Sequence, residues 1–208
     1  MLILLSISFL GYSQSHELKY NAGVNLANTT GYAYDTENRI APMLSVEYLL
    51  VSENNWFYSF GLGYSSKGHS EKIYFTFDDG SFDRTEDSHL KLNYLVLPLK
   101  IGYSLGSKWN FKPSVGISLG KYLSGEMELR DQQTGEYLVT DAPNPASFEV
   151  SALADLSISH DINEKFSIGP SIGYHYALTK ASKLDYYLWE DLKTRAISAT
   201  ISLTYHLD

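Results

Sequence analysis

The sequence predicts an all-β fold, an eight-stranded antiparallel up-and-down transmembrane β-barrel with short periplasmic turns and long extracellular loops. Three observations support this prediction. Segments in which every second residue is apolar recur eight times along the 208 residues. The connections between these segments are alternately short and long. The residues between the apolar ones are mostly small or polar, and each segment is long enough to cross a bilayer as a tilted strand.

Each of the eight strands is justified by an apolar face of period two. The strands are expected at about residues 17–28, 40–51, 56–66, 90–103, 109–120, 148–159, 165–178 and 194–207. In the same order, their apolar faces are Leu18, Tyr20, Ala22, Val24 and Leu26; Leu44, Val46, Tyr48 and Leu50; Trp56, Tyr58, Phe60, Leu62 and Tyr64; Leu95, Leu97, Leu99, Ile101 and Tyr103; Trp109, Phe111, Pro113, Val115, Ile117 and Leu119; Val150, Ala152, Ala154, Leu156 and Ile158; Phe166, Ile168, Pro170, Ile172, Tyr174 and Tyr176; Ile197, Ala199, Ile201, Leu203, Tyr205 and Leu207.

The connections between the strands predict the topology. The short ones, at 51–55, 104–108 and 161–164, carry the Asn, Gly, Ser or Asp residues that tight turns require. The long ones are expected at 29–39, 67–89, 121–147 and 179–193. Short turns on the periplasmic side and long loops outside are typical of outer-membrane barrels, so both termini are expected in the periplasm, where the first and last strands pair.

Two of the long connections contain their own strand pattern. Ile73, Phe75 and Phe77 alternate with polar residues before Asp78-Asp79-Gly80, which is a hairpin signal. Met127 and Leu129 precede a second turn at Gly135, and Tyr137 and Val139 follow it. We therefore expect the third to the sixth strand to project beyond the membrane.

The composition of the polar face indicates that lipid lies outside the barrel. A soluble barrel places its apolar face inward and covers its exterior with Lys and Glu, whereas here the polar face is mostly Gly, Ser, Asn and Thr. Small side chains suit the narrow lumen of eight strands. The alternative is a soluble, periplasmic, lipocalin-like barrel that binds a small molecule.

Four prolines, Pro42, Pro98, Pro113 and Pro170, fall inside the strands, and bulges are expected there.

Composition restricts the class of protein. The chain has no cysteine, so it has neither disulfides nor cysteine metal sites, and its net charge of −8 argues against nucleic-acid binding. The 17 Tyr and 3 Trp suit membrane interfaces. An apolar run from Met1 to Phe9 is too short to span a bilayer and predicts a signal peptide at residues 1–13, followed by a barrel domain at residues 14–208.

Charged residues on the lumenal face are the candidate site. They are Glu47, Lys100, Lys112, Asp155 and His175. Buried charges are costly unless they are paired, so these residues predict an internal salt-bridge network. The functional alternative is a path for protons or ions, although a pore is not expected because eight strands leave a packed lumen.

Two further groups suggest chemistry near the outer rim. The segment 67–89 holds six carboxylates that are candidates for calcium binding, but their spacing does not match a calcium loop, so we expect a solvated acidic loop. Three histidines, His69, His89 and His175, raise the alternative of a lipid enzyme acting at the rim. Because no spaced catalytic motif accompanies them, we predict no enzymatic activity, no catalytic residue, no metal and no cofactor.

The segment Leu90 to Tyr103, LKLNYLVLPLKIGY, resembles a recurring segment of the PorT-like outer-membrane β-barrel family of Bacteroidetes. The Tyr-Ser-Gln end of the signal region and the segment Lys112 to Gly120 are also similar to that family. The resemblance covers nearly the whole mature chain and implies an outer-membrane location in a Gram-negative bacterium. It also implies an accessory role in protein secretion, because the family's namesake is associated with the type IX route.

These observations together predict a non-enzymatic outer-membrane protein with a structural or protein-interaction role. Its expected partners are outer-membrane lipid around the barrel and an envelope protein at the extracellular loops, because loops on a rigid scaffold usually carry function. A soluble binding barrel and a rim-active lipid enzyme are the alternatives.

Overall fold

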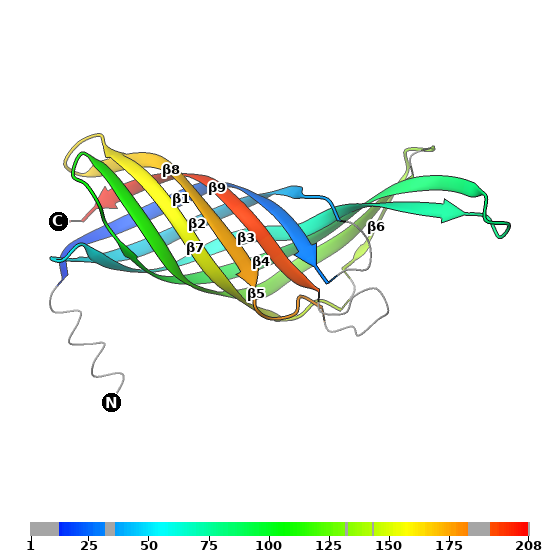
Figure 1. The fold of residues 1–208 in the computed structure, drawn as a ribbon, viewed down its shortest axis with the longest axis horizontal. Helices are drawn as coiled ribbons and strands as arrows, with labels where there is room; N and C mark the ends of the chain where they lie inside the picture. Colours follow the sequence, from blue (N-terminus) through cyan, green and yellow to red (C-terminus); the bar gives the residue numbers. More distant parts are fainter. Residues whose placement is uncertain (1–12, 32–35, 132, 143, 183–191, 208) are drawn as a thin grey trace, which may run out of the picture.

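The computed structural model describes residues 13–31, 36–131, 133–142, 144–182 and 192–207. The predicted signal segment, residues 1–13, lies outside them except for Ser13, where the first strand begins. The strands are β1 (Ser13–Thr30), β2 (Arg39–Ser52), β3 (Trp56–Thr76), β4 (Phe82–Tyr103), β5 (Trp109–Asp131), β6 (Tyr137–Asp141), β7 (Phe148–Asp161), β8 (Phe166–Ala177) and β9 (Lys193–His206) (Figure 1). In the part of the chain so described, no helix is long and apolar enough to cross a bilayer.

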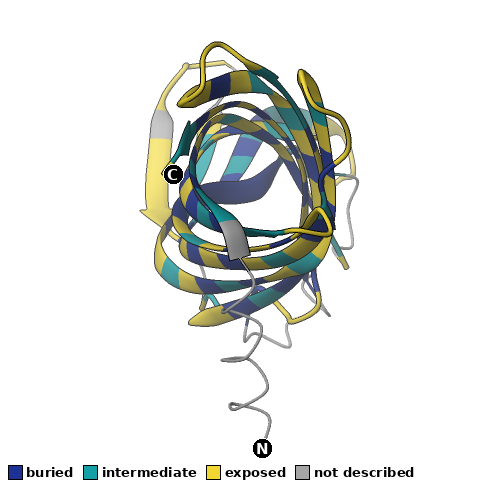
Figure 2. Ribbon diagram, turned by 90° about the vertical axis from the view of Figure 1, so that its left-hand side faces the viewer, coloured by how far each residue is buried: buried dark blue, intermediate teal, exposed yellow. Residues whose placement is uncertain are grey.

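Eight of these strands close into a ring. All neighbouring strands are antiparallel, and the order around the ring is β1, β2, β3, β4, β5, β7, β8 and β9. The ring closes between β9 and β1, in a continuous register from Glu17↔His206 to Thr30↔Lys193. Viewed along the barrel, the strands surround one central axis (Figure 2). The predicted eight-stranded antiparallel barrel is confirmed, and β6 is an extra strand attached to β5 alone.

The two ends of the barrel differ as predicted. At one end, the short-turn end, tight connections join β2 to β3, β4 to β5 and β7 to β8. Asn55 and Gly106 take positive φ values of 63° and 101° in two of these turns, a conformation that Asn and Gly tolerate best. The first residues of β1 and the last of β9 lie at the same end (Figure 1). The opposite end is the long-loop end.

Three strands extend well beyond the ring at the long-loop end. β3 and β4 continue as a hairpin, and β5 continues beside β4 until it turns back into β6 (Figure 1). We call the four-stranded extension formed by residues 70–89, 126–131 and 137–141 the projecting sheet. The two predicted hairpins are thus confirmed, but the sixth predicted strand, β7, does not project; it begins at Phe148, within the ring.

The four strand prolines produce gaps in the ladders, and the prediction of bulges at these sites is wrong. The register shifts lie elsewhere, between Ser13 and Ser15, Phe75 and Thr76, and Asn93 and Tyr94. Each proline keeps its pair with one neighbouring strand and lies at a gap or an end of the ladder with the other. The retained pairs are Pro42↔Val24, Pro98↔Ser118, Pro113↔Leu156 and Pro170↔Ile201. The missing N–H of each proline therefore falls where the sheet makes no ladder bond.

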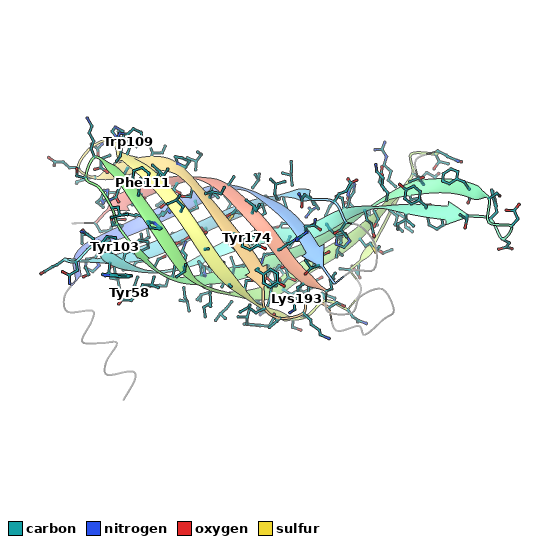
Figure 3. The ribbon with its side chains drawn as sticks, in the orientation of Figure 1. Tyr58, Tyr103, Trp109, Phe111, Tyr174 and Lys193 are labelled. Atoms are coloured by element: carbon teal, nitrogen blue, oxygen red, sulfur yellow. The ribbon has the colours of Figure 1, made fainter. Side chains whose placement is uncertain are left out.

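The large apolar side chains of the ring point outward. Phe111, Val115, Ile117 and Leu156 are 43, 58, 42 and 40% exposed, and their polar neighbours in the strands face the lumen. The same alternation of exposed and buried residues runs around the ring (Figure 2). Near the short-turn end, Tyr58, Tyr103 and Trp109 stand on the outer surface, as interfacial aromatics do (Figure 3). An apolar exterior of this kind is what lipid contact requires and what a soluble carrier avoids.

Candidate functional site

The buried lumenal lysines Lys67, Lys100 and Lys112 pair with carboxylates on strands that are not their neighbours in the sheet. At the short-turn end, Lys112 Nζ on β5 lies 2.5 Å from Glu17 Oε2 on β1. The other oxygen of that carboxylate lies 3.6 Å from His206 Nδ1 on β9. The ammonium of Lys112 and the carboxylate of Glu17 both point inward and are almost fully buried. The pair spans the ring, because β1 and β5 lie opposite each other in the strand order.

A three-residue cluster occupies the middle of the lumen. Lys100 Nζ lies 2.7 Å from Glu47 Oε2 and 3.0 Å from Asp155 Oδ2, so one ammonium bridges carboxylates of β2 and β7. Glu47 also accepts hydrogen bonds from Ser59 Oγ at 2.8 Å and Asn21 Nδ2 at 3.1 Å. These bonds satisfy the carboxylate in a site from which water is largely excluded.

A third ion pair closes the lumen toward the long-loop end. Lys67 Nζ lies 2.5 Å from Glu149 Oε1, and both side chains are fully buried. Thr194 Oγ1 donates to Glu149 Oε2 at 2.6 Å, and Ser151 Oγ donates to its other oxygen at 2.8 Å. The ammonium also lies 5.7 Å from the ring centre of Tyr94, within cation–π range.

The five lumenal residues singled out in the sequence all line one narrow cavity of about 50 Å³. Lys100 joins Glu47 and Asp155, Lys112 pairs with Glu17 outside that cluster, and His175 Nε2 lies 3.4 Å from Ser198 Oγ. A cavity of this size holds about three or four water molecules. It is far smaller than the several hundred Å³ of a site for a small organic ligand.

Four charged residues of the lumen were not predicted from the sequence: Glu17, Lys19, Lys67 and Glu149. The signal for three of them was present, because Glu17, Lys19 and Glu149 alternate with outward residues of predicted strands. Lys67 was missed because the strand was expected to end at residue 66. Lys19 is buried beside Glu47 in the register, and its hydrogen bond is to Ser171 Oγ at 3.4 Å. Among the described residues, no carboxylate lies within 4.0 Å of its ammonium.

An apolar cluster, which the sequence analysis did not predict, fills the lumen next to Lys67. Leu90, Leu92, Tyr94 and Val96 on β4 point inward and are almost completely buried. Three residues from the long-loop end, Ala142, Ala181 and Leu192, pack against them. We call this cluster the apolar plug. The lumen therefore keeps polar side chains toward the long-loop end, where the apolar plug lies beside the Lys67–Glu149 pair.

The three rim histidines do not form a common site. His69 is buried and lies 2.7 Å, through Nδ1, from Thr29 Oγ1, with Glu71 Oε1 4.0 Å from its Nε2. His89 Nδ1 contacts Ser70 Oγ at 2.8 Å. Because Ser70 is the register partner of His89, these two residues share one face of the sheet, and the adjacent His69 lies on the other. His175 belongs to the lumenal cavity.

The acidic segment 67–89 forms most of the β3–β4 hairpin instead of a solvated loop, so that expectation is corrected. Its turn is held by Asp79, whose Oδ1 accepts from Ser81 N at 2.8 Å and Ser81 Oγ at 2.5 Å. These hydrogen bonds hold the pKa of the Asp79 carboxyl below its ordinary value. Within the described ranges, no group of three or more His, Asp or Glu residues is arranged to hold a metal ion.

The projecting sheet presents exposed apolar side chains outside the ring. Tyr74, Phe77, Phe82, Leu138 and Val139 are all more than half exposed there. An ion pair between neighbouring strands, Lys91 on β4 with Glu128 on β5, lies at its base. The projecting sheet and the lumen are therefore the two candidate functional regions of the molecule.

A family model described as outer membrane protein beta-barrel domain matches residues 12–183. The solved structure of a major outer membrane protein from Thermus thermophilus is similar at 10% identity and a TM-score of 0.52, over 93% of this chain and 98% of that chain. OprG from Pseudomonas aeruginosa is similar at 8% identity and a TM-score of 0.50, over 95% of this chain and 98% of that chain. These two likenesses concern the fold.

The outer membrane protease OmpT from Escherichia coli is a further similar structure, with 7% identity and a TM-score of 0.48 over 94% of this chain and 97% of that chain. No curated protein sequence matches the chain.

Proposed function

Because this chain belongs to the outer membrane protein beta-barrel domain family and lies in the outer membrane, we propose that it is a non-enzymatic scaffold presenting the projecting sheet to an envelope protein. The observation that carries this proposal is the contrast between the two ends of the molecule. The short-turn end has only tight connections, whereas β3, β4, β5 and β6 form an ordered sheet beyond the ring. Ordered strands with exposed aromatic and aliphatic side chains suit protein contact better than solvation alone.

The interior supports a scaffold role over transport. Its charges are held by partners on other strands, and the apolar plug fills the space toward the long loops. An eight-stranded barrel is just wide enough for its side chains to fill it. The lumen is accordingly a polar core that fixes the barrel's shape, and function is left to the surface at the long-loop end.

The arrangement of the histidines favours a non-enzymatic role. A rim-active hydrolase needs a nucleophile and a base that face a common space for the substrate. Thr29 and His69 are close to each other, but both are buried. Neither of them lines the lumenal cavity, so that cavity does not bring a substrate to them. His89 lies on the opposite face of the sheet.

The resemblance to the PorT-like family of Bacteroidetes suggests the cellular setting. In that setting, the projecting sheet would face outward from the cell and serve as an accessory contact in protein secretion. The short-turn end would then face the periplasm, together with both ends of the barrel domain.

The test is removal of the projecting sheet from an intact barrel. Residues 73–86 and 127–140 are each replaced by Asn-Gly, which joins the register pairs Lys72↔Asp87 and Glu126↔Asp141 by two-residue turns. The shortened protein is expected to keep heat-modifiable migration in gels and to lose the envelope protein that the full barrel captures by crosslinking on intact cells. A control with Glu53→Ala and Glu164→Ala, at the short-turn end, should keep that partner. Equal capture by the shortened barrel would overturn the proposal.

Orientation is tested separately on intact cells. Trypsin added outside should cleave at Lys72, Arg84 or Arg130 in the projecting sheet and leave the ring intact. Cleavage only after the outer membrane is permeabilised would contradict the outward placement of the sheet.

A further inference from the structure

β6 is the free edge of the projecting sheet. It pairs with β5 from Glu126↔Asp141 to Arg130↔Tyr137, and it is the last strand in the order of the sheet. In the described ranges, no strand pairs with its other side. A strand in this position offers backbone donors and acceptors to another extended chain.

The register identifies which backbone groups point away from the sheet. Ala142 N donates to Gly125 O at 3.0 Å, so this pair is a hydrogen-bonded pair of the antiparallel ladder. Hydrogen-bonded and non-hydrogen-bonded pairs alternate along antiparallel strands. Tyr137, Val139 and Asp141 therefore direct their N–H and C=O groups outward, whereas Leu138 and Thr140 direct theirs to β5.

β6 is short and ends in the charged Asp141, but within the described part of the chain it lacks the lysine, proline or covering segment that often protects a sheet edge. Residues 137–141, YLVTD, contain no lysine, arginine or proline, and Leu138 and Val139 are 58 and 54% exposed on opposite faces. The other edge, on β3, is partly covered, because Glu37 and Ser70 exchange two backbone hydrogen bonds at 2.7 and 3.1 Å. That edge also carries Lys72. β6 is thus the more open of the two edges.

Charge specifies the chemistry of the occupant. Residues 126–141 contain one basic residue, Arg130, and five acidic ones: Glu126, Glu128, Asp131, Glu136 and Asp141. Glu128 is paired with Lys91, so four other carboxylates contribute to the negative charge near the edge. A second copy of this chain would bring the same negative charge to the edge, and the whole chain carries −8. A segment with Lys or Arg beside its apolar residues would instead meet opposite charge.

We infer that β6 binds an extended, basic segment of a partner polypeptide as an added strand of the projecting sheet. This inference rests on the proposed function and names the partner's chemistry. Backbone hydrogen bonds to residues 137, 139 and 141 provide the pairing, the exposed Leu138 and Val139 contact apolar side chains, and the surrounding carboxylates select Lys and Arg.

The test uses the full barrel in detergent micelles and a fluorescein-labelled ten-residue peptide of alternating Lys and Val. Fluorescence anisotropy should show saturable binding that weakens as salt is added. Val139→Pro removes an outward N–H without removing a bond to β5, and it should raise the dissociation constant about tenfold. Val139→Ala keeps the N–H and should bind within about threefold of the parent, since only side-chain contact is lost.

Two further arms separate an added strand from simple charge attraction. The same peptide with alternate backbone nitrogens methylated keeps its charge but loses its donors, and it should bind about tenfold more weakly. Val139→Lys keeps the backbone and should weaken binding of the Lys–Val peptide, which guards against a hairpin misfolded by proline. Equal binding of a Glu–Val peptide or of the methylated peptide overturns the inference.

The remaining outcomes also decide the question. Concentration-dependent dimers that Val139→Pro abolishes would show that a second copy occupies the edge, and the inference would be wrong. If Val139→Pro binds the peptide normally while the shortened barrel loses its cellular partner, the edge inference fails and the proposed function stands. If the shortened barrel keeps that partner, the proposed function fails, whatever the peptide does.

Discussion

Glu17 on β1 and Lys112 on β5 form an ion pair between opposite walls of the barrel, with 2.5 Å between Oε2 and Nζ. The two residues are 95 positions apart in the sequence, and no ladder of the sheet connects their strands. Such a contact fixes the cross-section of the ring, because each wall supplies the charge that the other requires.

Removal of one member of this pair should destabilise the barrel. Lys112→Met leaves the buried Glu17 carboxylate with His206 alone and is expected to lower the free energy of unfolding by about 3–5 kcal/mol. The double variant Glu17→Gln, Lys112→Met should recover most of the loss, because no uncompensated charge remains. Urea unfolding in vesicles, followed by tryptophan fluorescence, measures both. If the single variant loses less than about 1 kcal/mol, the buried ion pair stabilises the barrel no more than a solvent-exposed ion pair would, and the prediction is wrong.

Charge on the outer wall should be costly in a way that depends on lipid. Val115 is exposed on the middle of β5 within the ring. Val115→Arg is expected to cost about 2–4 kcal/mol in a bilayer, where the guanidinium meets hydrocarbon. Val115→Leu, the control, should be close to neutral in the same unfolding measurement. Tolerance of the arginine would be the result expected of a water-soluble barrel.

The apolar plug predicts an electrically silent barrel. Leu90, Leu92 and Tyr94 are buried in an apolar cluster beside the Lys67–Glu149 pair, so we expect no water-filled path for ions past them. Purified protein in planar bilayers should show no stable conductance steps. A triple variant with serine at these three positions should admit water and produce measurable steps if it folds, as heat-modifiable migration will show. Stable steps from the unaltered protein would refute the sealed lumen.

The hairpin tip should respond to acid. Hydrogen bonds from Ser81 favour the ionised Asp79 carboxylate, so the carboxyl in the folded tip has a lowered pKa. The stabilisation that these hydrogen bonds give to the folded tip is fully present above the ordinary pKa of aspartate, about 3.9. It is lost as the pH falls through the lower pKa that the carboxyl has in the folded tip. The amide resonance of Ser81 should therefore titrate with a midpoint below about 3.9. Asp79→Asn should remove this titration, and a midpoint at or above the ordinary value would contradict the hydrogen-bonded turn.

The alternation of apolar and small residues was sufficient to predict the ring. A period of two defines both faces of a strand, so Val115 and Ile117 were assigned outward and Lys100 and Lys112 inward from their positions alone. The short turns added the topology, because Asn, Gly, Ser and Asp mark them directly. These are local signals, and a single sequence carries them in full.

Features that depend on distant partners were not predictable. The pairing of Lys112 with Glu17 depends on the stagger of strands around the ring, which no local pattern encodes. Leu90, Leu92 and Tyr94 interrupt the polar lumen because Ala142, Ala181 and Leu192 cover them from other loops. Pro98 and Pro170 lie at gaps inside a ladder, whereas Pro42 and Pro113 lie at ladder ends, and this difference depends on the stagger of the neighbouring strands.

The seam between β1 and β9 has a consequence for how the protein matures. Its partners, from Glu17 with His206 to Thr30 with Lys193, come from opposite extremes of the barrel domain. The ring can therefore close only after β9 has been synthesised. Until then, the unpaired edges of the sheet can contact lipid or other polypeptide chains. Insertion into the membrane has to protect those two edges, so the protein is most open to aggregation before β9 pairs with β1.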